Sequence, residues 1–104
     1  MRKIAPIRKS NNDGFCRVMV CSSDEGYYLF LYDSHTDGSC KADYLYNELD
    51  KLYDHCKKEY GIDKMYWQEI EDPLPEAQQD WIAPTRIKRN KSGNKQFGEF
   101  EPIL

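Results

Sequence analysis

The 104-residue chain lacks long apolar runs, and it lacks the cysteine and histidine spacings of common metal sites. No segment approaches the roughly 20 consecutive apolar residues that a membrane-spanning helix requires. The basic N-terminus is not followed by an apolar stretch, so no secretory signal is expected. Neither C-x-x-C nor H-x-x-x-H occurs, which excludes the usual zinc motifs. We therefore predict a protein that neither spans a membrane nor binds a metal.

A chain of this length can build one hydrophobic core, so a single α+β domain is expected over residues 1–104. Its four cysteines do not suggest a disulfide framework. Cys16 and Cys21 lie five apart in one predicted strand, where their side chains point to opposite faces and cannot bridge. Cys56 belongs to the apolar face of a predicted helix. Without an export signal, reduced thiols in the cytoplasm are the expectation.

Charge is unevenly distributed along the chain, although the formal net charge is only −3. Each of three segments contains five basic residues, but their acidic residues differ in number. Residues 1–20 contain one acidic residue, residues 21–80 contain fifteen, and residues 81–104 contain two. The acidic middle segment would attract a basic partner, whereas the basic ends could contact nucleic acid. The simpler alternative is that solvated faces differ in sign without a partner.

Apolar residues at steps of three and four predict an amphipathic helix from Cys40 to Tyr60. The residues that form this apolar stripe are Ala42, Leu45, Leu49, Leu52, Tyr53, Cys56 and Tyr60. Ser39 or Asp37 is suited to cap the N-terminus of the helix. Gly61 is suited to the left-handed residue that ends it.

Alternation of apolar and polar residues predicts strands on both sides of this helix. The strands Phe15–Ser22 and Tyr27–Asp33 should form a hairpin, and the other expected strands are Lys3–Arg8, Lys64–Ile70, Trp81–Arg89 and Gln96–Glu101. Pro6 indicates an edge strand or a strand start. The predicted fold is α+β: a mostly antiparallel sheet of five or six strands, with one long helix at residues 40–60 packed on one face.

The strand Tyr27–Asp33 is apolar on both faces, which normally means that it is covered on both sides. One helix covers only one face, so either the C-terminal segment or a partner chain should cover the other. If a partner does, aromatic side chains beside acidic ones would form the binding surface. Its predicted residues are Tyr28, Phe30, Tyr32, Tyr66, Trp67, Glu69, Glu71, Asp72 and Trp81. The alternative is that these rings belong to the core.

The loop Asp33–Gly38 is the best local candidate for chemistry. It resembles the start of a calcium loop, but His35 and Tyr44 stand at the third and twelfth positions, where such a loop needs an oxygen ligand and a glutamate. Cys40, near the expected helix N-terminus and close to His35, could be an activated nucleophile. The competing interpretation is a half-buried cysteine at the start of the apolar stripe. No catalytic residue and no metal ligand is predicted.

The profile is typical of a small, acidic, cytoplasmic protein-binding module without enzymatic activity or cofactor. An inhibitor or immunity-type protein that occludes a basic partner is the leading hypothesis. Two alternatives stay open. One is a small Cys-dependent enzyme that uses Cys40 and His35. The other is nucleic-acid binding by the basic C-terminal hairpin, whose cations are Arg86, Lys88, Arg89, Lys91 and Lys95.

Overall fold

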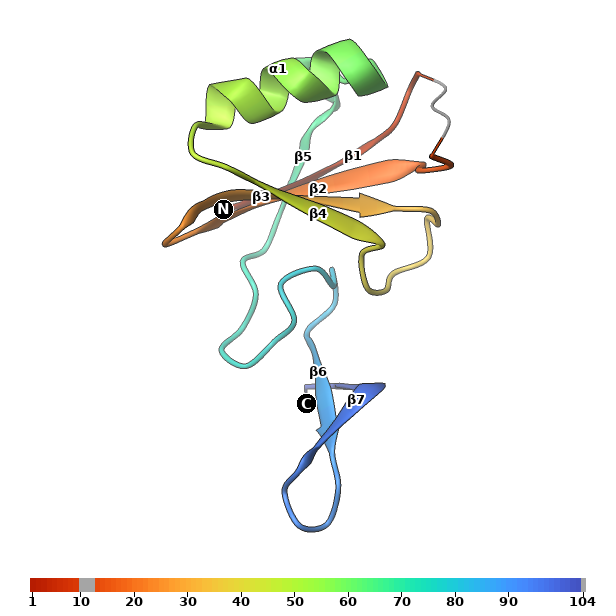
Figure 1. Ribbon diagram of the computed structural model, residues 1–104, viewed down its shortest axis with the longest axis vertical. Coiled ribbons are helices and arrows are strands. Elements are labelled where there is room, and N and C mark those ends of the chain that lie inside the picture. Colours follow the sequence, from red (N-terminus) through yellow and green to blue (C-terminus); the bar gives the residue numbers. More distant parts are fainter. Residues whose placement is uncertain (10–12, 104) are drawn as a thin grey trace.

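The computed structural model describes residues 1–9 and 13–103, except for the side chain of Phe97. It contains a five-stranded antiparallel sheet, one α-helix across one face of that sheet, and a separate two-stranded hairpin (Figure 1). The predicted α+β fold is therefore confirmed. The hairpin projects from the side of the sheet opposite the helix, and the molecule measures 47 × 28 × 20 Å (Figure 1).

The large sheet has the strand order β4-β3-β2-β1-β5, with antiparallel pairing throughout. Its strands are β1 Arg2–Pro6, β2 Arg17–Ser23, β3 Gly26–Tyr32, β4 Ala42–Tyr46 and β5 Gln68–Ile70. The predicted hairpin is β2–β3. Pro6 does not mark an edge or a start, because β1 lies between β2 and β5 and Pro6 is its last residue. The pairing with β5 already ends at Ile4, so the missing N–H of Pro6 costs that ladder nothing.

The helix α1 spans Leu49–Tyr60 and is shorter than the predicted helix at residues 40–60. Ala42–Tyr46 instead forms β4, which extends the sheet by pairing with β3. Over five residues an apolar pattern fits a strand as well as a helix, and tyrosine favours strands. Leu45, assigned to the apolar stripe, is 49% exposed. Glu48 precedes α1 without a capping bond, so neither Ser39 nor Asp37 is the N-cap.

The second half of the predicted helix is confirmed. Leu52, Cys56 and Tyr60 are buried against the sheet. Gly61 adopts the left-handed conformation with φ 67° and ψ 28°, and its N–H donates to the carbonyls of Cys56 and Lys57. Ile62 then folds back and donates its N–H to the Cys56 carbonyl at 3.2 Å. This reversal sends the chain back along α1.

The segment after α1 contains less strand than predicted. Lys64–Tyr66 is a short 3-10 helix, η1, so only the last three residues of the expected strand Lys64–Ile70 form β5. The small second sheet consists of β6 Thr85–Arg89 and β7 Lys95–Pro102. β6 lies within the expected strand Trp81–Arg89, and β7 is one residue longer at each end than the expected strand Gln96–Glu101.

Each face of the large sheet carries its own buried cluster. On the α1 side, alternate residues of β2 and β3 pack with Leu52, Cys56 and Ile62. On the other side lie Met19, Cys21, Phe30 and Tyr32, with Ile70 and Ile82 against them. The expectation that β3 is covered on both faces is confirmed, and part of the C-terminal segment forms the second cover (Figure 1).

Arg2 holds this second cover in place. Its side chain is 3% exposed and donates to four backbone carbonyls. Those of Glu71, Gln79 and Trp81 lie at 2.8, 3.0 and 2.6 Å, and that of Ile82 lies at 3.4 Å. Because the four acceptors span residues 71–82, one guanidinium ties both ends of the covering segment to β1.

We predict that Arg2→Gln lowers the free energy of unfolding by about 2–3 kcal/mol, because a glutamine cannot reach carbonyls on both ends of the segment. Urea denaturation measures this loss. Arg86→Gln is the matched control: Arg86 lies on the hairpin in an exposed pair with Glu101, and such pairs contribute under about 1 kcal/mol. Equal midpoints for the two variants would show that the segment is held by other contacts.

Candidate protein-binding site

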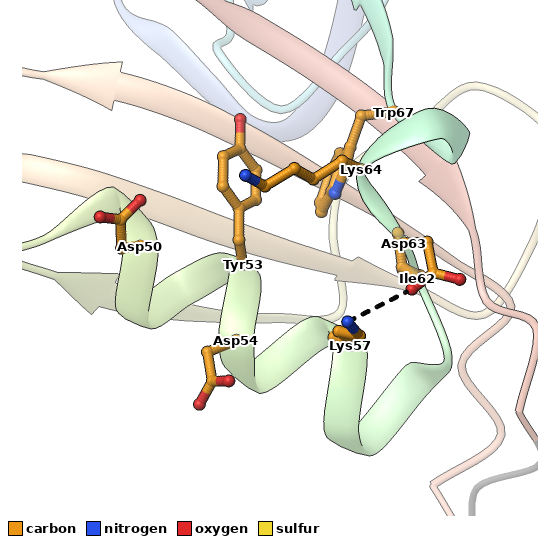
Figure 2. A pocket seen from close by; sticks show the side chains of 8 residues that line it. All are labelled: Asp50, Tyr53, Asp54, Lys57, Ile62, Asp63, Lys64 and Trp67. Carbon is orange, nitrogen blue, oxygen red and sulfur yellow. Dashed lines mark ion pairs between the residues drawn. The ribbon is translucent and has the colours of Figure 1, made fainter.

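A groove of about 300 Å³ runs between α1 and the segment that returns along it (Figure 2). The Gly61 reversal brings η1 and Trp67 beside α1, and the groove lies between them. The residues that line it are Asp50, Tyr53, Asp54, Lys57, Ile62, Asp63, Lys64 and Trp67.

An aromatic pair forms one wall of the groove. The rings of Tyr53 and Trp67 lie 5.4 Å apart at 53°, and both pack at the edge of the core on the α1 side. The Tyr53 hydroxyl is buried and has no hydrogen-bond partner among the described residues. A buried hydroxyl normally has a partner, so this group is an exception. Met65, 80% exposed on η1, adds an apolar side chain next to the groove.

The charges around the aromatic pair are mostly committed to each other. Lys57 pairs with Asp63 at 3.8 Å (Figure 2), and Lys58 pairs with Asp54 at 2.9 Å. Asp50 forms no ion pair with any residue that the structure describes. Lys64 also lines the groove, and Lys3 Nζ lies 5.8 Å from the Tyr53 ring centroid. An acid and aromatic rings that line one groove are groups that attract a guanidinium or an ammonium group.

The predicted binding surface does not form as one surface. Tyr28, Phe30 and Tyr32 lie on the sheet face opposite α1, whereas Tyr66 and Trp67 pack on the α1 side. Phe30 and Tyr32 are buried, so for these two rings the core interpretation is correct. Tyr28 is half-buried, stacks on Phe30 at 5.7 Å and donates its hydroxyl to Glu25.

The remaining predicted residues have separate structural partners. Glu69, Glu71 and Asp72 are exposed on or after β5, at the edge of the sheet. Asp72 pairs with the N-terminal amine at 2.8 Å, which lowers the pKa of its carboxyl group. Trp81 donates its indole N–H to Ser39 and packs on Phe100 at 5.1 Å, so it ties the hairpin to the loop before β4. Of the predicted residues, only Trp67 lines the groove.

Cys40 does not occupy a helix N-terminus, because it precedes β4. Its backbone N–H donates to the Asp80 carboxylate at 2.9 Å. Burial, followed by the negative charge of Asp80, raises the pKa of the Cys40 thiol to about 12. The loop acid Asp37 accepts hydrogen bonds from the N–H groups of Ile82 and Ala83. Asp80 and Asp37 thus accept hydrogen bonds from backbone N–H groups. Among the described residues, no three His, Cys, Asp or Glu side chains are grouped to bind a metal.

We predict that Cys40 is alkylated by iodoacetamide at pH 8 about tenfold more slowly than in the urea-unfolded chain, because its thiol stays protonated below its raised pKa. The rate should keep rising with pH beyond the ordinary thiol pKa of about 8.5, because thiolate forms up to the raised value. Mass spectrometry of the Cys40 peptide measures it. Asp80→Asn removes the nearby negative charge and should therefore speed the reaction. Rapid alkylation of the folded chain at neutral pH would restore the Cys-dependent enzyme hypothesis.

Sequence reasoning missed the two buried arginines and most of the groove. Arg17 shares the apolar face of β2 with Met19 and Cys21, and a charge on such a face was the available signal. Asp50 and Tyr53 gave no comparable signal, because a groove beside a helix depends on where the returning chain lies.

No protein-family model matches this chain, no curated protein is similar to it, and no solved structure matches its fold. Among the described residues, no helix is both long and apolar enough to span a membrane.

Proposed function

We propose that this protein is a protein-binding module of the inhibitor or immunity type, which covers a basic surface of its partner. The supporting observation is the groove beside α1, which is lined by the Tyr53–Trp67 pair and by Asp50, an acid that forms no ion pair with a described residue. A partner arginine would stack on the rings and pair with Asp50, and an anchor of this kind contributes strongly to protein interfaces. The cytoplasm stays the predicted location.

The distribution of exposed charge supports a basic partner. Residues 1–80 contain sixteen acidic and ten basic residues. Two of the ten, Arg2 and Arg17, are buried and bind backbone carbonyls, so their guanidinium groups are not exposed to a partner. The charged groups that this part exposes are therefore more acidic than the sequence indicates, which favours association with a basic protein.

We predict that N-acetyl-arginine amide binds in this groove and shifts the NMR signal of the Trp67 indole N–H. Asp50→Asn should weaken binding about fivefold or more, because it removes the charge that pairs with the guanidinium. Asp24→Asn, an exposed acid far from the groove in sequence, is the matched control. The neutral isostere N-acetyl-citrulline amide should bind more weakly. Equal binding of the two probes, or a shift of the Trp81 signal alone, would contradict the proposal.

The same site should contact the whole partner. A photo-crosslinking amino acid at Met65 should capture a basic protein in the source cells, and capture should fail when Asp50→Lys is added. Leu74, also exposed, gives the control position on another part of the chain. Capture of acidic proteins, or equal capture from both positions, would speak against a basic partner at the groove.

Nucleic-acid binding by the C-terminal hairpin is the second candidate. The observation that favours it is the projection of β6–β7 from the sheet (Figure 1), which leaves Lys88, Lys91 and Lys95 exposed. Arg86 is less available because it pairs with Glu101 at 2.9 Å, and Arg89 donates to the Gly93 carbonyl.

We predict for this candidate that replacing Lys88, Lys91 and Lys95 with alanine abolishes binding to a labelled single-stranded oligonucleotide at low salt, because about three phosphate contacts are lost. Fluorescence anisotropy measures the binding. Replacing Lys51, Lys57 and Lys58 of α1 instead is the matched control. Absence of binding by the unaltered protein would exclude this function.

A further inference from the structure

A second cavity lies at the end of β1. Its volume is about 200 Å³. Residues from β1, the start of β2, the loop after β3, η1, β5 and the covering segment line it, among them Ile4, Pro6, Arg17, His35, Gln68 and Ile82. It is separate from the groove beside α1, with which it shares no residue.

Arg17 is a buried cation with an unused donor group. Its side chain is 5% exposed and stacks on the Tyr32 ring, 3.8 Å from the centroid. Its Nε donates to the Ser34 carbonyl at 3.0 Å and its Nη2 to the Thr36 carbonyl at 3.1 Å. Its Nη1 is buried and has no hydrogen-bond partner among the described residues.

No carboxylate balances this charge. Arg17 forms no ion pair with a described residue. The two acids near its Tyr32 neighbour, Asp37 and Asp80, already accept backbone N–H bonds. Burial of a charge and of unbonded N–H groups costs several kcal/mol unless an anion or acceptor compensates. Arg17 lines the cavity, so an anion bound there would supply the compensating charge.

We propose that this cavity binds a small organic carboxylate, whose carboxylate group meets Arg17 and whose apolar body lies against Ile4, Pro6 and Ile82. His35 and Gln68 supply further polar groups on the lining. The volume is below the roughly 300–1,000 Å³ of pockets for drug-sized ligands, so an acid with one ring or a short chain fits. The apolar wall favours such an acid over an inorganic anion.

Benzoate is the probe, with benzamide as the neutral isostere and sulfate as the anion without an apolar body. In an NMR titration of the unaltered protein, benzoate should saturably shift the guanidinium signals of Arg17 and the side-chain amide of Gln68. It should leave the Trp67 indole signal unchanged, which separates this site from the proposed protein-binding groove. No variant is needed for this first measurement, so a folding defect cannot obscure it.

Two variants then test the residues. Arg17→Lys keeps the charge but removes the guanidinium, and with it Nη1 and the donors to Ser34 and Thr36, and we expect about tenfold weaker benzoate binding. His35→Ala, at an exposed loop position that should not affect folding, should weaken it about threefold. Arg86→Lys on the hairpin is the matched control and should bind as the unaltered protein does. Equal shifts with benzamide, equal shifts with sulfate, or no shift with benzoate would each overturn the proposal.

Discussion

The four hydrogen bonds of the Arg2 guanidinium are the constraint on which the rest of the molecule depends. They join β1 to both ends of the segment 71–82, and this segment brings Ile82 onto the face of the sheet that α1 cannot reach. The Tyr32 hydroxyl adds a bond to the Asp80 carbonyl on the same segment. Without this cover, Met19 and Phe30 would face solvent. This face of the sheet is covered by a segment that the buried Arg2 guanidinium holds in place, and not by a second helix.

Burial of Arg2 and Arg17 also shapes the surface. Two cations that the sequence places in a basic N-terminal region are inside the protein, where they bind carbonyl oxygens of distant loops. The exposed residues of positions 1–80 are left with a larger excess of acids. The two proposed sites are opposite in charge: the groove offers Asp50, which pairs with no described cation, and the cavity offers Arg17, which pairs with no described acid.

Much of the fold could be predicted because strand and helix periodicities are local. The prediction of which residues of β2 and β3 share a face was correct, and so was the prediction of a left-handed Gly61 at the end of α1. The predicted helix start was wrong because Ala42–Tyr46 satisfies its backbone by pairing with β3, a contact that no local pattern reveals. The predicted binding surface was divided for a related reason. Alternation assigns a ring to a face of its own strand, but it does not say whether two strands expose the same face.

The sequence by itself determined which residues are apolar on each strand, where the helix ends, and that one helix leaves a second face to be covered. Only the tertiary structure decided what covers it, which arginines are buried, and which side chains line the groove and the cavity. The physical reason is the range of the interactions. Backbone geometry and side-chain period act within a few residues, whereas Arg2 meets its acceptors about seventy to eighty residues away.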